Sequence, residues 1–87
     1  MSQILIVEDS KLEAEKLRKC LENKGFSIQI VGSGEEAEIR LKSSKPNLIF
    51  LDVILPGESG FELCRKLKTE PTTQGIPIVI FSTKDKQ

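Results

Sequence analysis

The chain contains no histidine and only two cysteines, Cys20 and Cys64, which are not arranged as a C-x-x-C pair. Without histidine or such a pair, the sequence has the ligand spacing of neither a zinc site nor a disulfide framework. Both cysteines fall in segments with a helical pattern. We expect them to be small core residues, and we expect Phe61, in the third helical segment, to lie in the core as well.

The sequence also lacks an excess of charge of either sign. It has 13 Lys and Arg residues against 13 Asp and Glu residues, so its formal net charge is zero. Because basic surfaces dominate nucleic-acid binding, we expect no direct nucleic-acid contact. No apolar run approaches the roughly 20 residues that a membrane-spanning helix needs, and the N-terminus carries no signal-peptide pattern. These absences favour a cytoplasmic protein without membrane contact.

A length of 87 residues corresponds to one small domain, residues 1–87. Within it, apolar runs alternate with segments whose apolar residues recur at spacings of three and four, which indicates strands and helices in turn. Each helical segment follows a Ser-x-x-Glu capping box, at Ser10, Ser33 and Ser59. The expected strands are residues 4–7, 27–31, 47–52 and 76–81.

Strands that alternate with helices imply right-handed crossovers and a parallel sheet. Residues 27–31 alternate polar and apolar side chains, so we expect this second strand at an edge. The first and third strands both end in acidic residues, and for these two strands to be adjacent they must pair. That pairing gives the order 2-1-3-4, a doubly wound, flavodoxin-like α/β fold. The ligand-binding switch point of such a fold would lie between its first and third strands, at their carboxyl ends.

Acidic residues follow both strands that meet at this switch point. Glu8 and Asp9 come after the first strand, and Asp52 ends the third, which is the most apolar segment of the chain. Clustered carboxylates repel one another, and a divalent cation relieves the repulsion. Oxygen ligands on a small polar rim suit Mg²⁺ better than Ca²⁺. We predict Glu8 and Asp9 as Mg²⁺ ligands, Asp52 as a nucleophile toward phosphorus, and Ser82 as a hydrogen-bond donor to a phosphoryl oxygen.

Each of these residues also has a structural interpretation. Glu8 and Asp9 can complement the dipole at the start of the following helix. Asp52 can be a turn residue, because Asp is common where a strand passes into a loop. Ser82 can cap a helix that begins at Thr83, a role compatible with phosphoryl binding. For the acidic residues, their occurrence together favours the phosphoryl-transfer interpretation.

From Ile4 to Thr83 the chain resembles the response-regulator receiver domains of two-component signalling. The resemblance rests on the acidic pair after the first strand, the Asp-x-x-Leu-Pro-x-x-x-Gly run of residues 52–60, Pro71 and Pro77, and a Ser that ends the fourth strand. It implies a phosphoacceptor that signals through altered partner binding, not an enzyme with independent substrate turnover. The implied partner is a sensor histidine kinase or a phosphotransfer protein.

The resemblance assigns roles to individual positions of this sequence. It implies metal ligands at Glu8 and Asp9, a phosphoacceptor and ligand at Asp52, a metal-binding backbone carbonyl at Ile54, and a switching hydroxyl at Ser82. Glu8 departs from the family, which more often has Asp at that position. The additional methylene of Glu8 favours contact with the ion through a water molecule.

Receiver domains continue beyond a fourth strand with a helix, a fifth strand that carries a phosphate-contacting Lys, and a fifth helix. This sequence ends at Gln87, and Lys84 and Lys86 follow the fourth strand too soon to replace that lysine. The resemblance therefore implies an incomplete receiver domain in which the 76–81 strand is an exposed edge. Because exposed edges pair with other strands, we expect a homo-oligomer or a domain-swapped dimer through residues 76–81. The alternative is that this chain is one piece of a longer receiver.

Two other functions remain open from the sequence. One is a receiver-like scaffold that assembles through its exposed strand and never switches. The other is a Mg²⁺-dependent phosphatase with an aspartyl nucleophile. Such phosphatases typically place a second Asp two residues after the first, where this chain has Ile54. A flavin site fits less well, because no phosphate-binding Gly or Ser/Thr loop follows the first strand.

Overall fold

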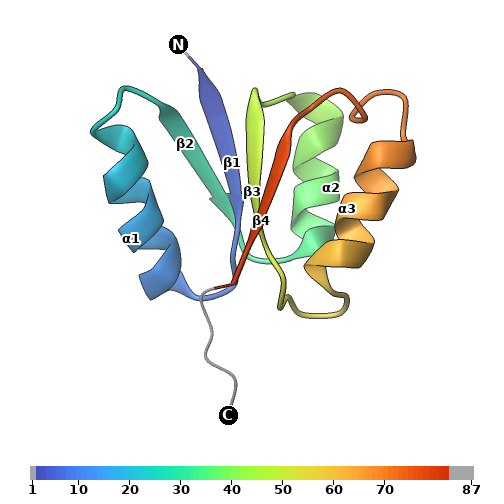
Figure 1. Ribbon diagram of the computed structural model, residues 1–87, viewed down its shortest axis with the longest axis horizontal. Helices are drawn as coiled ribbons and strands as arrows, with labels where there is room; N and C mark the ends of the chain where they lie inside the picture. Colours follow the sequence, from blue (N-terminus) through green and yellow to red (C-terminus); the bar gives the residue numbers. More distant parts are fainter. Residues whose placement is uncertain (1, 83–87) are drawn as a thin grey trace.

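The computed structural model describes residues 2–82. Strands and helices alternate along this part of the chain, in the order β1 (Gln3–Val7), α1 (Lys11–Glu22), β2 (Ser27–Val31), α2 (Gly34–Ser43), β3 (Leu48–Asp52), α3 (Gly60–Thr69) and β4 (Ile78–Phe81). Figure 1 shows three layers, with α1 on one face of the sheet and α2 and α3 on the other. Among the described residues, no helix has the length and apolarity to cross a membrane.

The sheet is parallel, and its strand order is β2-β1-β3-β4, as predicted. Within it β1 pairs with both β2 and β3, so that Ile6 lies between Ile30 and Phe50. The last strand, β4, pairs with β3 and places Phe81 opposite Asp52. All carboxyl ends therefore meet at one edge of the sheet, which is the lower edge in Figure 1.

Each helix begins at a serine cap, as the capping boxes predicted. The hydroxyls of Ser10, Ser33 and Ser59 accept hydrogen bonds from backbone N–H groups three residues later, at 3.3, 3.1 and 3.2 Å. Such a cap satisfies an N–H group that has no partner within the helix, and replacing it by Ala typically costs about 1 kcal/mol. Three local signals thus set where the helices leave the carboxyl edge of the sheet.

The core lies mainly between the sheet and helices α2 and α3. Leu5 and Val7 of β1 belong to this buried cluster, together with Leu63 and Leu67 of α3. Alternate residues of a strand point to opposite faces, and Ile4 and Ile6 on the other side of β1 are also buried. Coverage on both faces explains why the sequence of β1 is a continuous apolar run.

The α1 face of the sheet is covered less completely than the other face. Phe50 of β3 and Phe81 of β4 pack edge to face there, with ring centroids 6.3 Å apart. A hollow of about 330 Å³ is lined by both rings and by Leu17 and Cys20 of α1. The two aromatic side chains are therefore only half-buried.

Two core predictions are wrong. Cys20 is exposed, because it lies beside the inward stripe of α1 and not on it. Phe61 is 58% exposed, since it lies two residues before the buried Leu63 and therefore does not share the inward face of α3. By contrast, Cys64 is partly buried and packs against the core cluster.

The fourth strand is shorter than predicted. It begins at Ile78, whereas the apolar run suggested residue 76. Pro77 has no N–H group, so it joins the sheet only as an acceptor, from the Ile49 N–H at 3.0 Å. Ile76 instead belongs to the buried core cluster.

Candidate functional site

Three carboxylates meet at the carboxyl edge of the sheet, between β1 and β3. One carboxylate oxygen from each of Glu8, Asp9 and Asp52 lies within 4.8 Å of the others. The pairing of β1 with β3 causes this proximity, because Val7 lies opposite Leu51 and the acidic residues come next in both strands. The structure thus brings together the acidic residues that the sequence placed at the switch point.

The three carboxylates differ in their exposure. Asp52 is fully buried at 0% and Glu8 is 2% exposed, while Asp9 is exposed at the rim. Buried carboxylates need hydrogen-bond donors or cations to balance their charge. The site therefore has an acidic floor that a cation or a donor group can approach from the side of Asp9.

Backbone donors orient two of these carboxylates. The N–H of Ser10 donates to Glu8 Oε2 at 2.8 Å, and the N–H of Ile54 donates to Asp52 Oδ1 at 3.3 Å. Since Ser10 is the N-cap of α1, Glu8 does lie at the start of that helix. A carboxylate has two oxygens with several acceptor positions, so this local role of Glu8 is compatible with metal binding.

The chain folds back sharply after Asp52. The N–H of Gly60 donates to the carbonyl of Val53 at 2.7 Å, and Ile54 and Ser59 form an antiparallel bridge. Gly57 has a φ of 88°, which favours glycine. The loop of residues 53–59 is thus held at both ends, directly beside the buried carboxylate.

Ser82 is the last residue that the structure describes. The N–H of Val53 donates to the carbonyl of Phe81 at 2.9 Å, so Ser82 follows β4 at the same edge as Asp52. It is exposed. The predicted helix cap at Thr83 lies outside the described residues, as do Lys84 and Lys86.

An ion-pair group that no sequence motif indicated lies beside the loop. Lys66 Nζ is 3.1 Å from Glu58 Oε2 and 3.6 Å from Glu38 Oε2. The hydrogen bond that Lys66 donates to Glu58, followed by the negative charge of Glu38, raises the pKa of Lys66 above its ordinary value. Sequence reasoning missed this group because its members come from the loop, α2 and α3, with no fixed spacing among them.

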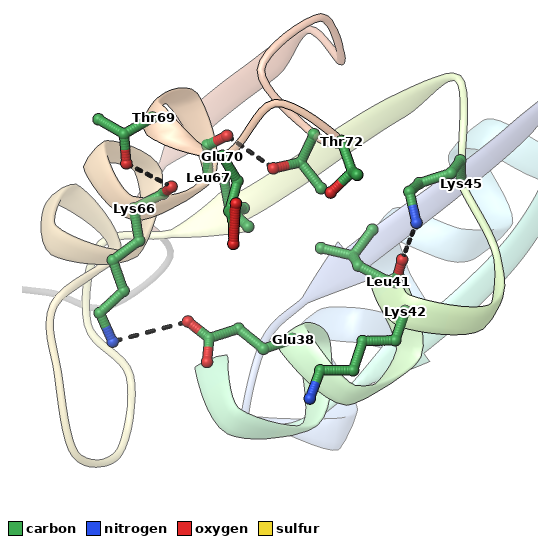
Figure 2. Close-up of a pocket in the computed structure, with 10 residues that line it drawn as sticks. Glu38, Leu41, Lys42, Lys45, Lys66, Leu67, Thr69, Glu70 and Thr72 are labelled. Carbon is green, nitrogen blue, oxygen red and sulfur yellow. Dashed lines mark hydrogen bonds and ion pairs between the residues drawn. The ribbon is translucent and has the colours of Figure 1, made fainter.

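A separate hollow of about 550 Å³ lies between α2 and α3 (Figure 2). Leu41 and Leu67 line it, together with Lys42, Lys45 and Thr73, and none of the three clustered carboxylates does. Lysines near the last turn of a helix complement the negative end of its dipole, which accounts for their presence here. This hollow is therefore distinct from the acidic site.

A doubly wound parallel sheet with carboxylates at its switch point defines a flavodoxin-like α/β domain with an acidic site. Comparison with known families shows which family of this class the chain belongs to. The family model described as "Response regulator receiver domain" matches residues 4–87, and the chain belongs to that family. Receiver domains are modules of two-component signalling.

Individual relatives agree with this assignment. The phosphate regulon transcriptional regulatory protein PhoB of Rhizobium meliloti (strain 1021) is 40% identical over 87 residues, which are 100% of this chain and 38% of that protein. The phosphorylated cyanobacterial phytochrome response regulator RcpA has a TM-score of 0.88 and 32% identity, covering 98% of this chain and 67% of that one. The Mn²⁺-bound form of response regulator Rcp1 has a TM-score of 0.88 and 30% identity, covering 100% of this chain and 69% of that one.

Proposed function

We propose that this chain accepts a phosphoryl group on Asp52, with Mg²⁺ held beside it, and signals by altered partner binding. One observation carries the proposal: Asp52 is the fully buried member of a set of three carboxylates within 4.8 Å of one another at the switch point. The relative RcpA was solved in a phosphorylated form and Rcp1 in a Mn²⁺-bound form, which is consistent with this chemistry.

The residues present fit a small divalent cation. All donors are oxygen atoms, and Mg²⁺ takes one or two carboxylates while keeping several waters. We assign Asp9, Asp52 and the backbone carbonyl of Ile54 as direct ligands and Glu8 as a ligand through water. The hydrogen bond from Ser10 to Glu8 supports the indirect role, because it holds that carboxylate toward the start of α1. When bound, the ion neutralises charge on the phosphoryl oxygens and aligns the group.

Asp52 acts as the nucleophile in this scheme. Its carboxylate oxygen forms a bond to phosphorus while the phosphorus–nitrogen bond of a phosphohistidine donor breaks, and the imidazole nitrogen keeps the electron pair. The Ile54 N–H at 3.3 Å orients the carboxylate for this attack. Ser82 donates its hydroxyl hydrogen to a phosphoryl oxygen and so reports the modification to the end of β4. A sensor histidine kinase or a phosphotransfer protein supplies the phosphoryl group.

Intact-mass measurement after incubation with Mg²⁺ and an acyl phosphate tests the proposal. We expect one added phosphoryl group on the wild type, and no addition with EDTA or in Asp52→Asn. The matched control is Glu15→Gln, which removes a carboxylate from the exposed face of α1 and should leave the addition unchanged. A folded wild-type protein that takes up no phosphoryl group would rule the proposal out.

A second candidate function is assembly through β4. Among the described residues β4 pairs with β3 alone, and Val79 on this strand is 42% exposed. An edge strand of this kind presents unpaired backbone groups to other strands. We therefore also propose a homo-oligomer or a domain-swapped dimer through residues 76–81, which sedimentation equilibrium would detect. A monomer at every concentration measured would contradict it.

The structure supports neither of two further interpretations of the sequence, which are the phosphatase alternative and the absence of nucleic-acid contact. A phosphatase would need a second acid at residue 54, where the structure has the 49% exposed side chain of Ile54. The absence of nucleic-acid contact by this chain stays a prediction, which rests on its zero net charge.

A further inference from the structure

We infer that Glu58 is a positioning residue: its carboxylate, seated beside Gly34 and paired with Lys66, fixes the loop that follows Asp52. The inference rests on the proposed function of Asp52 for its chemical consequence. Its structural basis is a contact between the loop and two helices that lie at one face of the sheet (Figure 1). None of these three residues belongs to the acidic cluster.

The first part of the argument is the position of the Glu58 carboxylate. The side chain is only 19% exposed, although it belongs to a surface loop. A Cβ added at Gly34 would lie 2.8 Å from Glu58 Oε1 and 3.3 Å from Leu63 Cδ2. Because Gly34 has no side chain, the Glu58 carboxylate can occupy the space beside it. Because Gly34 is the first residue of α2, the carboxylate also lies near the positive end of that helix dipole.

The second part is the partner on the other side of the carboxylate. Lys66 of α3 approaches Glu58 Oε2 at 3.1 Å and Glu38 of α2 at 3.6 Å. Figure 2 shows the Lys66 side chain extended toward Glu38 across the space between the helices. An exposed ion pair alone stabilises a structure little. Here the carboxylate also lies beside Gly34 of α2, so the loop contacts both helices through one side chain.

The third part is the short path from Glu58 to the phosphoacceptor. Ser59 next to it bridges to Ile54, whose N–H donates to Asp52 Oδ1. The carbonyl of the same Ile54 is a proposed metal ligand. Displacement of Glu58 therefore moves Ile54. The N–H of Ile54 orients Asp52, and its carbonyl contributes to the proposed Mg²⁺ site. Misplacement of such groups by a fraction of an ångström impairs function.

Two variants remove the contact by different means. Glu58→Gln keeps the size of the side chain and removes its charge. Gly34→Ala keeps every charge and places a Cβ 2.8 Å from Glu58 Oε1, so that the carboxylate must shift. The control is Glu38→Gln, which removes the 3.6 Å ion pair of Lys66 with Glu38 and leaves its 3.1 Å ion pair with Glu58 intact. Lys66→Arg is the conservative variant, and its guanidinium still pairs with Glu58.

Amide hydrogen exchange by NMR without Mg²⁺ reports the loop, and amide shifts during a Mg²⁺ titration report the ion site. We expect Glu58→Gln and Gly34→Ala to speed exchange at Ile54 and Gly60 about two- to five-fold, the range for an ion pair of this kind. Mg²⁺ affinity should fall by a similar factor. Glu38→Gln and Lys66→Arg should stay near the wild type in both measurements.

The inference is overturned if neither Glu58→Gln nor Gly34→Ala changes exchange at these two amides. It is also overturned if exchange rises equally throughout the core, since that would show general destabilisation. One further outcome would distinguish the inference about Glu58 from the function proposed for Asp52. If the loop-specific effect appears in a protein that takes up no phosphoryl group, the role of Glu58 in fixing the loop is supported and the function proposed for Asp52 fails.

Discussion

Gly60 packs directly on the backbone of Asp52: a Cβ at residue 60 would lie 2.2 Å from the Asp52 carbonyl oxygen. The partner atom is backbone at the end of a buried strand, so it cannot move aside as a flexible side chain would. Every other side chain at this position would force α3 away from β3. The glycine therefore has a steric role that links β3, the strand that ends in Asp52, to the helix after it.

Gly60→Ala should destabilise the protein by about 1–3 kcal/mol, the typical range for steric conflicts in a packed region. The chain has no Trp and no Tyr, so far-UV circular dichroism in urea is the suitable measurement. Gly75→Ala is the matched control, because a Cβ there meets nothing within 4 Å. That control should change the free energy of unfolding by less than about 0.5 kcal/mol. Equal effects of the two substitutions would contradict the steric role.

Mg²⁺ should stabilise the folded wild type, because a ligand that binds only the folded state shifts the unfolding equilibrium. At about ten times its dissociation constant, the ion should add about 1.4 kcal/mol to the free energy of unfolding. Asp9→Asn and Asp52→Asn should abolish this increment, and Glu8→Gln should reduce it only in part, since Glu8 is proposed to bind through water. Thermal unfolding with Mg²⁺ and with EDTA measures it.

Glu62→Gln provides the control for the Mg²⁺ experiment. Glu62 is exposed in the first turn of α3, outside the acidic cluster. The variant should therefore gain as much stability from Mg²⁺ as the wild type does. An equal gain in Asp52→Asn would show that the ion acts elsewhere on the protein.

The fold could be predicted from the sequence because its signals are local. A buried β1 reads as an unbroken apolar run, and Ser10, Ser33 and Ser59 mark the helix starts through hydrogen bonds only three residues long. The convergence of the acidic residues and the strand order were predicted together, since the first and third strands must be adjacent for their carboxyl ends to bring these residues to one site. What these carboxylates bind stays a prediction.

The features that escaped prediction depend on long-range packing. Cys20 and Phe61 lie close to apolar stripes in sequence, yet whether they are covered depends on which element packs above them. The contact of Glu58 with Gly34 and Lys66 joins three segments with no common spacing. Gly60 was visible as part of a family motif, but its steric reason appears only when the Asp52 carbonyl is placed beside it.

Val79→Lys should weaken any self-association through β4. Val79 is 42% exposed on this strand, and a lysine on an edge strand disfavours pairing with another edge. The expected result is a shift toward monomer in sedimentation equilibrium with an unchanged circular dichroism spectrum. Leu12→Lys is the control, because Leu12 is 65% exposed on α1 and lies outside β4. If both lysines weaken association equally, general charge repulsion and not the strand edge is responsible.

The ion pairs of Lys66 should give the stability of the protein a dependence on alkaline pH. Glu58 and Glu38 raise the pKa of Lys66 in the folded state above the ordinary value of 10.5. The contribution is therefore fully present below pH 10.5 and declines as the pH rises through the folded-state pKa. The difference in melting temperature between wild type and Lys66→Met should therefore decrease as the pH rises above 10.5. Lys66→Arg should keep its stability there, because a guanidinium stays charged. A difference that persists unchanged at higher pH would mean that Lys66 stabilises the protein through packing of its methylene groups and not through its charge.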